Sequence, residues 1–595
     1  MPFHRPLRRR GARPKTAAAL AGVLLAGAGA CTAPGRPSAA ADGCAAQPLA
    51  PAALQGTGAA SPLLGQHVIT EGIVVGDFEG NDEAAGDLDG FFLQGKADGD
   101  MASSNAVFVY VPNGGPVAAG DRVQVRGTVE EQFNQTQVGT VTRVAVCQRG
   151  DHGVDQPEPT TLALPVDAPT DFEALEGMRV RLNGLTVAET RLLDDFGEVL
   201  LSAGGRLSTP TDAADPGQDA RAVTAANLNR QIVLDDGRSG TQRRPVSYLP
   251  PGETLRAGDT LDEVTGVLSF AFDRWRVQPT EPVTFEAANL RTQAPTDVGA
   301  DLRVASFNVL NYFTSLTGGR GATNPGDFTQ QQAKIVSAID ALGADIVALQ
   351  EIESNDGLAT QALVDALNHA AGGQPWAAVP VPANFTGTDK ITVGQIYRPA
   401  AAQRVGDPVA LADPAFANAR QPIAQTYASG GNAFTVIANH FKSKSCGEAA
   451  GENADQGDGA GCWNSDRVRQ AQALTAFVAE RRAATGDADV LILGDLNSYI
   501  REEPVDVLVL AGLVNQLTRH VSDPERYTYV FNGARGVLDH AFATSELSAR
   551  ITGAALWHIN ADEPDLLEYT GDPAYTVLDP YRASDHDPVI IGIGP

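Results

Sequence analysis

Six short motifs in the second half of the sequence place acidic, amide or imidazole side chains directly after apolar runs. The residues concerned are Asn308, Glu351, His440, Asp495 with Asn497, Asp539, and Asp585 with His586. Carboxylates hold hard cations, amides orient oxygen atoms without adding charge, and a histidine beside an acid can transfer a proton. Such a set suits phosphoryl-group chemistry, which depends on positioning and charge stabilisation.

The first two motifs end apolar stretches in an amide and in a carboxylate. Residues 304–307 are expected to form a strand that ends at Asn308, although an Asn at a strand end is also a common turn former. Residues 345–350 lead into Glu351, and a carboxylate at the end of a buried strand can hold a cation such as Mg²⁺. The alternative for Glu351 is a solvated glutamate at the rim of a sheet.

The third and fourth motifs add a histidine and an acid–amide pair. An apolar run ends in His440, with Lys442 and Lys444 close behind it. Protonated His and Lys side chains suit a phosphate whose charge is shifting. Another apolar run precedes Asp495 and Asn497, which point the same way under strand alternation. One of these two would serve proton transfer while the other would hold a phosphoryl oxygen.

The last two motifs supply the acids and the base of a proton-transfer group. Asp539 follows a short apolar run, and the triplet Asp585-His586-Asp587 precedes the final one. A histidine beside carboxylates is poised as a general base, because the acid fixes its tautomer and stabilises the imidazolium. Each motif alone has an ordinary structural explanation. Six in this order, each next to an apolar run, are hard to attribute to coincidence.

The apolar pattern also predicts the elements that would position these motifs. Residues 286–300 carry Pro and Gly without periodicity and mark a domain boundary. Beyond it strands alternate with helices, which predicts a mixed α/β domain over residues 300–595. One helix is expected to begin near Asp327, which fits a capping box with Gln330.

The region before that boundary predicts two small all-β modules, over residues 51–150 and 156–285. Short β-type runs alternate there with Gly and Pro turns. The phrase Gly120–Val129 is echoed by Gly258–Val267, which suggests a duplication. OB-folds bind single-stranded nucleic acid by aromatic stacking and backbone charge, and Trp275 would suit that role. The alternative is that such aromatics fill the core and that the modules only space or dock the catalytic domain.

The N-terminal residues 1–30 predict a signal peptide, because basic residues precede an apolar run that begins at Ala17. Residues 31–50 are rich in Ala, Pro and Gly and are expected to form a linker. Export predicts a secreted, extracellular protein. If cleavage leaves Cys31 as the first residue, the protein would instead be a lipoprotein at the cell surface.

Four further cysteines agree with export to an oxidising compartment. They are Cys44, Cys147, Cys446 and Cys462, and three pairings are possible. The local pairing joins Cys44 to Cys147 and Cys446 to Cys462, so that each bridge stays inside one expected domain. The second bridge would close a short loop rich in Gly and acidic residues.

Length and charge limit the classes of protein to which the chain can belong. A chain of 595 residues is too long for one hydrophobic core, and its 43% hydrophobic and 19% charged residues are ordinary for globular domains. A net charge of −28 argues against a broad basic face for duplex binding. Nucleic-acid binding would therefore depend on local Arg and Lys side chains and on metal ions.

The six motifs resemble those of the endonuclease/exonuclease/phosphatase superfamily, which includes pancreatic-type deoxyribonuclease and apurinic-site endonucleases. Their order, with β-modules in front, resembles bacterial extracellular nucleases of the ExeM/NucH type. The resemblance implies a C-terminal four-layer α/β/β/α sandwich preceded by two small all-β OB-like modules. It covers residues 300–595 closely and the front modules loosely.

The resemblance also implies roles for individual residues. Mg²⁺ or Mn²⁺, with Ca²⁺ as a further candidate, would be bound by Glu351, Asp585 and Asn308. Leu310 stands where some apurinic-type members carry an acid, which leaves the number of metal ions open. The catalytic residues implied are Asn308, Glu351, Arg398, His440, Asp495, Asn497, Asp539, Asp585 and His586.

The expected function is that of a secreted metal-dependent nuclease that hydrolyses phosphodiester bonds of extracellular DNA, with RNA as a second substrate. One alternative is a lipid or other phosphodiesterase of the same superfamily, which would use the same core residues. Another is a catalytically silent DNA-binding surface protein. No protein partner is implied, and a membrane would be involved only through a lipid at Cys31.

Overall fold

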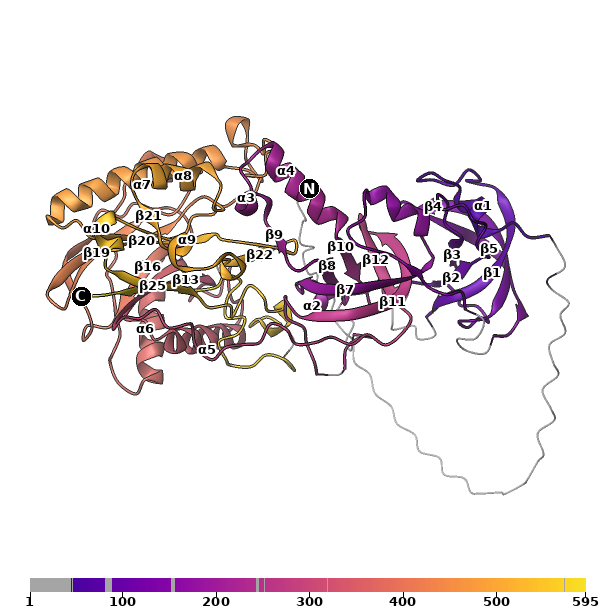
Figure 1. The fold of residues 1–595 in the computed structure, drawn as a ribbon. Coiled ribbons are helices and arrows are strands. Elements are labelled where there is room, and N and C mark those ends of the chain that lie inside the picture. Colours follow the sequence, from indigo (N-terminus) through magenta and orange to yellow (C-terminus); the bar gives the residue numbers. More distant parts are fainter. Residues whose placement is uncertain are drawn as a thin grey trace, which may run out of the picture.

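The computed structural model describes residue 44 and residues 47–80, 88–150, 156–241, 246–250, 252–317, 319–571 and 573–595. The predicted signal peptide, Cys31 and most of the predicted linker lie outside these residues. Within them, no helix is both long and apolar enough to cross a membrane. Figure 1 shows three units in a row, in which a middle unit lies between a β-barrel and a larger α/β unit.

The first unit is a closed five-stranded barrel with strand order β1-β2-β3-β5-β4. Buried valines, leucines and Phe91 fill its interior. A disulfide joins Cys44 to Cys147. The elements are α1 (Pro51–Gln55), β1 (His67–Phe78), β2 (Gly90–Gln94), β3 (Ala106–Tyr110), β4 (Arg122–Gln132) and β5 (Gln135–Gln148).

The middle unit is built on a six-stranded sheet with order β11-β12-β10-β8-β7-β6, in which β11 also pairs with β7. Its strands are β6 (Thr160–Thr161), β7 (Arg179–Glu189), β8 (Val199–Ala203), β10 (Gln231–Leu234), β11 (Thr260–Ala271) and β12 (Arg274–Pro279). Outside the sheet lie η1 (Pro169–Asp171), η2 (Glu173–Leu175), α2 (Leu193–Phe196), β9 (Leu207–Ser208), α3 (Pro210–Ala213) and α4 (Gln218–Asn229).

The echoed sequence phrases lie in corresponding hairpins of these two units. The β4–β5 hairpin turns at Phe133 and the β11–β12 hairpin turns at Phe272, and both residues have positive φ and exposed rings. Trp275 instead stacks on Phe172 with ring centroids 5.6 Å apart and packs against the core of the middle unit. Its ring therefore takes part in packing, as the structural alternative for these aromatics predicted.

The α/β unit contains two six-stranded sheets. The first has order β15-β16-β14-β13-β26-β25 and the second β17-β18-β19-β20-β24-β21. The first sheet comprises β13 (Leu302–Tyr312), β14 (Ile346–Glu353), β15 (Ala377–Ala378), β16 (Ile391–Tyr397), β25 (Ile551–Leu556) and β26 (Val589–Ile593). The second comprises β17 (Gln403–Ala410), β18 (Ile423–Ser429), β19 (Asn432–His440), β20 (Val490–Asp495), β21 (Val514–Asn515) and β24 (Asp539–Ala543).

The central strands of both sheets are apolar on both faces because both faces are covered. Val304 and Ala348 of the first sheet share one core with Val436 and Leu493 of the second. Helices α5 (Pro325–Leu342) and α6 (Leu358–Ala370) pack on the other face of the first sheet. Helices α7 (Asn464–Thr485) and α8 (Glu503–Leu510) pack on the other face of the second. The predicted mixed α/β character of this half is confirmed.

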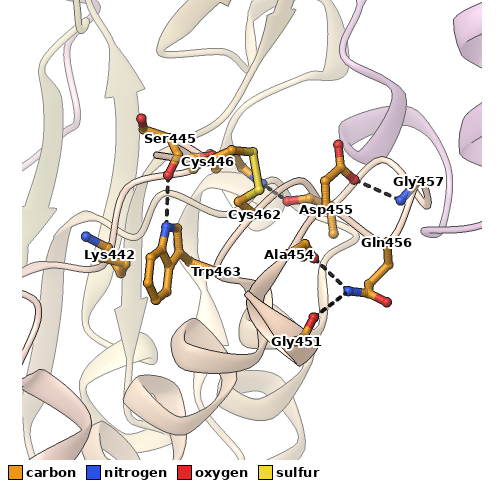
Figure 2. Close-up of a disulfide and its surroundings, with 12 residues drawn as sticks. Lys442, Ser445, Cys446, Gly451, Ala454, Asp455, Gln456, Gly457, Cys462 and Trp463 are labelled. Carbon is orange, nitrogen blue, oxygen red and sulfur yellow. Dashed lines mark hydrogen bonds between the residues drawn. A yellow bond between two sulfur atoms is a disulfide. The ribbon is translucent and has the colours of Figure 1, made fainter. Parts of the chain in front are cut away.

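Shorter elements connect these layers. They are η3 (Pro414–Phe416), η4 (Gly451–Asn453), α9 (Gln516–His520), η5 (Asp523–Glu525), β22 (Tyr529–Phe531), β23 (Ala534–Gly536), α10 (Ser545–Ser548) and η6 (Asp565–Leu567). The N-cap of α5 is Asn324, whose side chain accepts from the Asp327 backbone. The expected start near Asp327 was therefore too late, because Pro325 fits the first turn of a helix. A second disulfide joins Cys446 to Cys462 (Figure 2), which confirms the local pairing.

Candidate active site

Strand directions bring most of the motifs to one edge of the two sheets. β13 is parallel to β14, and β19 is parallel to β20, with His440 in register with Asp495. β24 runs antiparallel to β20 and begins at Asp539, which is also in register with Asp495. The carboxyl ends of the parallel strands and the first residue of β24 therefore meet.

Asn308 connects the two sheets. Its Nδ2 lies 3.4 Å from Glu351 Oε1 in the same sheet and 3.5 Å from Asp495 Oδ2 in the other. Its Oδ1 accepts from the backbone N–H of Leu310 at 3.1 Å, so the strand turns where the motif ends. The side chain is fully buried. Asn308 therefore acts here as a donor to two carboxylates, and its expected role as a metal ligand would require the amide to rotate.

His586 and Asp539 form the shortest acid–base contact among the predicted residues. His586 Nδ1 lies 2.7 Å from Asp539 Oδ2, while Nε2 lies 4.0 Å from Asp495 Oδ2. The ring of Tyr529 packs on the imidazole with centroids 4.6 Å apart. Burial disfavours the imidazolium, but the carboxylates of Asp539, Asp585 and Asp495 outweigh it and raise the pKa of His586 well above its usual value.

Asp495 and His440 lie deeper at the same edge. His440 Nε2 is 3.5 Å from Asp495 Oδ2. Burial, followed by the positive charge of Arg420, holds the pKa of His440 well below its usual value. The imidazole is therefore neutral, and the prediction of a protonated His440 is wrong because it ignored this burial. Burial also raises the pKa of Asp495 to about 7, so this acid can hold a proton near neutral pH.

Asn497 follows Asp495 closely and helps to fix it. Its backbone N–H donates to Asp495 Oδ1 at 2.7 Å, and its Nδ2 donates to the carbonyl of Phe441 at 3.3 Å. Asn497 adopts a positive φ of 47°. Asp495 and Asn497 therefore do not follow the alternation of a regular strand, because β20 ends at Asp495 and the chain turns between the two residues.

Two carboxylates provide the oxygen donors that a hard cation needs. Burial raises the pKa of Glu351, and the negative charge of Asp585 raises it further. Glu351 Oε2 also accepts from the N–H of Asn311 at 3.0 Å. Bringing two such charges together is unfavourable until a cation offsets them, so this donor set fits a divalent metal ion. A second set of possible ligand atoms, on Asp495, Asp539 and His586, lies within 4.8 Å of one another.

The two lysines of the third motif have different environments. Lys444 Nζ donates to both carboxylate oxygens of Glu502 at 2.6 Å, so it is engaged within the protein. Lys442 Nζ lies 4.8 Å from the ring centroid of Trp463. Figure 2 shows this lysine beside the indole, which is anchored by a hydrogen bond to the Ser445 carbonyl next to the disulfide. Among the described residues, Lys442 thus contacts an aromatic ring, whereas Lys444 is paired with a carboxylate.

Arg398 does not join the cluster. β16 runs antiparallel to β14, so Arg398 lies at the end of β14 opposite Glu351, where its N–H donates to Asp345 O at 2.8 Å. Its guanidinium stacks 4.6 Å from the ring of Trp376. The expectation that Arg398 is a site residue is corrected by this strand direction. A nearer cation is Arg420, which is buried, donates to the Phe441 carbonyl and partly opposes the rise that burial causes in the pKa of Asp495.

Several further residues support the site without having been predicted. Asp587 Oδ2 lies 2.8 Å from His558 Nδ1, and Asn560 Nδ2 donates to the carbonyl of His586 at 2.6 Å. Arg420 precedes a strand and Asn560 follows one, and neither has a spacing that marks it in sequence. Asp587 alone carried a signal, as the third member of the Asp-His-Asp triplet.

Comparisons with known families agree with the sequence motifs. The model of the Endonuclease/Exonuclease/phosphatase family matches residues 305–586. A domain of unknown function matches residues 154–288, which correspond to the middle unit. A search of curated proteins found no match.

Solved structures with similar chains each cover about half of this one. TDP2 of D. rerio, humanized by 14 mutations, is 16% identical, with a TM-score of 0.33 over 49% of this chain and 97% of that chain. The human Nocturnin catalytic domain with bound sulfate is 16% identical, with a TM-score of 0.32 over 51% of this chain and 95% of that chain. The mannosyl-6-phosphatase of Bacteroides thetaiotaomicron VPI-5482 is 15% identical, with a TM-score of 0.32 over 49% of this chain and 99% of that chain.

Proposed function

Taking residues 305–586 as a hydrolase domain of the endonuclease/exonuclease/phosphatase superfamily, we propose that the protein is a secreted, metal-dependent nuclease of the ExeM/NucH type. Its substrate would be extracellular DNA, with RNA as a second substrate. The observation that carries the proposal is the buried His586–Asp539 pair, whose free Nε2 faces Asp495 at 4.0 Å. Asn308 links Asp495 to Glu351. The proposed base His586, the proposed acid Asp495 and the cation-binding carboxylate of Glu351 therefore share one site.

His586 serves as the general base in this proposal. Asp539 accepts a hydrogen bond from Nδ1–H of His586 and so keeps the proton on that nitrogen. Nε2 is then the atom that accepts a proton from an attacking water. The carboxylates around His586 raise its pKa, whereas a cation bound to Asp585 would oppose that effect and favour the neutral, basic imidazole. The same carboxylates stabilise the imidazolium that forms once the proton has moved.

The remaining residues of the site hold the phosphoryl oxygens and the leaving group. A divalent cation such as Mg²⁺ or Mn²⁺, held by Glu351 and Asp585, would supply charge neutralisation at a non-bridging oxygen. Asn497 and neutral His440 orient phosphoryl oxygens by hydrogen bonding. Asp495, with a pKa of about 7, can give its proton to the leaving oxygen.

The preference for an extracellular polynucleotide is supported by features outside the α/β unit. The N-terminal sequence carries a charged segment and an apolar run typical of export. Two disulfides agree with an oxidising compartment. The two β units, which we propose to be OB-like modules, precede the hydrolase unit and add contact surface that a small phosphomonoester would not require.

The proposal is tested with the purified full-length chain on a panel of phosphodiesters. Circular and linear DNA, RNA, phosphatidylinositol phosphates and sphingomyelin are each incubated with EDTA, Mg²⁺, Mn²⁺ or Ca²⁺. We expect EDTA-sensitive cleavage of DNA that is lost in Glu351→Ala and His586→Ala. His369→Ala, on the exposed end of α6, is the matched control and should behave as wild type.

Other results would reject the proposal in distinct ways. Cleavage of lipid substrates but not of DNA would identify a lipid phosphodiesterase. DNA retention without cleavage in every metal would identify a silent binding protein. Full turnover of DNA by His586→Ala would exclude the assigned base.

A further inference from the structure

A segment of the middle unit, residues 207–229, leaves its own sheet and packs against the α/β unit. β9 pairs in parallel with β23, with Leu207 opposite Ala534 and Ser208 opposite Arg535. Figure 1 shows β9, α3 and α4 reaching from the middle unit toward the α/β unit. A three-stranded sheet of β22, β23 and β9 is therefore shared by two units that are far apart in sequence.

Two side chains of this segment bind groups of the α/β unit. Asp212 Oδ1 accepts from the backbone N–H of Val537 at 3.1 Å and from that of Ile500 at 3.5 Å. Thr211 Oγ1 donates to Glu502 Oε1 at 2.7 Å. Burial raises the pKa of Asp212 to about 6, although the two backbone N–H groups oppose this change.

The backbone held by Asp212 leads directly to Asp539, the acid that orients His586. Val537 lies two residues before Asp539, and the intervening backbone is also held from the other side. The N–H groups of Leu538 and Asp539 donate to Thr528 Oγ1 at 3.0 and 3.1 Å. Thr528 O accepts from the N–H of Asp587 at 2.8 Å. Asp212 and Thr528 thus fix the short chain that carries the partner of His586.

The backbone at Gly536 is packed closely against its neighbours. A Cβ on Gly536 would lie 2.6 Å from Tyr499 Cε1 and 3.0 Å from Thr209 Oγ1. Thr209 also donates through its backbone N–H to Arg535 O at 2.9 Å. Thr209 of the middle unit is therefore in direct contact with Arg535 and lies beside Gly536, just before the segment that leads to Asp539.

Buried ion pairs hold the middle unit in this place. Arg206 Nη2 lies 2.6 Å from Asp562 Oδ1, and Arg256 Nε lies 2.9 Å from Glu563 Oε1. Both acids are fully buried, and removing one partner of such a pair is strongly unfavourable. Separation of the two units would leave these buried charges unpaired, so the ion pairs favour the observed contact between the units.

We propose that Asp212, although it belongs to the middle β unit, is a positioning residue for the catalytic centre of the α/β unit. It acts through the Val537 backbone on Asp539 and so on the orientation of His586. The inference rests on the proposed phosphodiesterase function for its kinetic consequence. Its structural consequence, a less restrained 536–539 segment when Asp212 is shortened, does not depend on that function.

The test compares four full-length proteins: wild type, Asp212→Ala, Asp212→Asn and Asp219→Ala. The Asn variant keeps an oxygen that can accept both backbone N–H groups, and Asp219 is an exposed acid of the same segment. Initial rates with Mn²⁺ are measured on bis(p-nitrophenyl) phosphate, which is too small to reach the β units. Hydrogen exchange of the peptide covering residues 528–540 is measured alongside, with melting temperatures.

We expect Asp212→Ala to lower kcat by about 10- to 100-fold, the size of effect that a misplacement of up to about 1 Å produces, with KM changed by less than about threefold. Its 528–540 peptide should exchange about tenfold faster, as loss of one hydrogen bond implies. Asp212→Asn should stay near wild type in both measurements. Equal kcat and exchange in Asp212→Ala and Asp219→Ala would overturn the inference, as would an Asn variant as impaired as the Ala variant. A wild type inactive on every substrate would reject the proposed function, while the exchange comparison would still decide the role of Asp212.

Discussion

Replacing Glu176 with glutamine tests the junction between the barrel and the middle unit. Glu176 belongs to the middle unit but is buried against the barrel, where its Oε1 accepts from Gln55 Nε2 at 3.0 Å and from the N–H of Thr136 at 3.0 Å. Its Oε2 has no hydrogen-bond partner among the described residues. Burial raises the pKa of Glu176 to about 8.

The size and sign of the effect follow from that pKa. In the unfolded chain the acid has its ordinary pKa of 4.5, and folding raises this pKa to about 8. The difference corresponds to roughly 5 kcal/mol. The folded state binds the extra proton. The stabilisation of the folded state relative to high pH is therefore complete below pH 4.5, where Glu176 is protonated in both states, and is lost as the pH rises through about 8.

The variant removes this pH dependence. Glutamine keeps an oxygen for Gln55 and Thr136 but places an unpaired amide where Oε2 was, at a cost of about 1–2 kcal/mol. We therefore expect Glu176→Gln to be more stable than wild type by about 3 kcal/mol at pH 9 and slightly less stable at pH 4.

Hydrogen exchange in the full-length chain measures this junction without assuming two-state unfolding of three units. Peptides covering residues 104–110 and 135–140 are followed at several pH values and corrected for intrinsic exchange. Protection in wild type should fall between pH 5 and pH 9 and stay level in Glu176→Gln. Glu158→Gln, at an exposed position, serves as the control. Equal pH dependence in Glu176→Gln and wild type would show that the buried carboxyl does not titrate in this range and would refute the reasoning.

Three further predictions concern the α/β unit. Asp539→Asn removes the nearest charge that raises the pKa of His586, so the acidic limb of the pH–rate profile should move to lower pH while kcat falls by about 100-fold or more; an unmoved limb would argue against His586 as the base. Arg320, an exposed cation whose charge reaches the buried site, should contribute to DNA binding, so Arg320→Ala should raise KM and weaken the salt dependence of the rate with kcat nearly unchanged. Cys446→Ser opens a loop with a sequence separation of 16 residues and should destabilise the α/β unit by about 3 kcal/mol. The melting transition of this unit should be lower than in wild type, and reducing agent should lower it in wild type but not in the variant, whereas the barrel keeps its Cys44–Cys147 bridge in both until it is reduced.

The positions of the strand-end residues could be predicted because they follow from local rules. Apolar runs mark buried strands, and a polar side chain directly after such a run lies at the edge of a sheet. This reasoning identified Asn308, Glu351, His440 and Asp495, which the structure brings together. It required no knowledge of which strands are neighbours, since parallel strands with the same pattern end at the same edge.

The positions that depend on strand direction and on distant contacts could not be predicted in this way. Arg398 has the same local pattern as the true strand-end residues, but its strand runs antiparallel to β14 and ends at the opposite edge. Arg420 lies in an irregular segment and Asp212 in the four-residue helix α3, and neither position carries a periodic signal. The pKa of His440 was misjudged for a related reason, because burial on all sides is a property of the assembled sheets.

The backbone at the strand ends explains why amides and acids stand there. Asn308 accepts from the N–H two residues on, and Asp495 accepts from the N–H of Asn497, so both side chains close turns with one oxygen. Leu310 and Asn497 then adopt positive φ. This conformation costs about 1–2 kcal/mol for a residue such as leucine, whereas asparagine tolerates it better. The turn uses one oxygen of each side chain and aims the second polar atom at the opposite sheet, as the contact between Asn308 Nδ2 and Asp495 Oδ2 shows. Asn308 and Asp495 therefore each form a turn and each belong to the site. A substitution that keeps the turn-forming oxygen but loses the second polar atom should leave the fold intact and the site inactive.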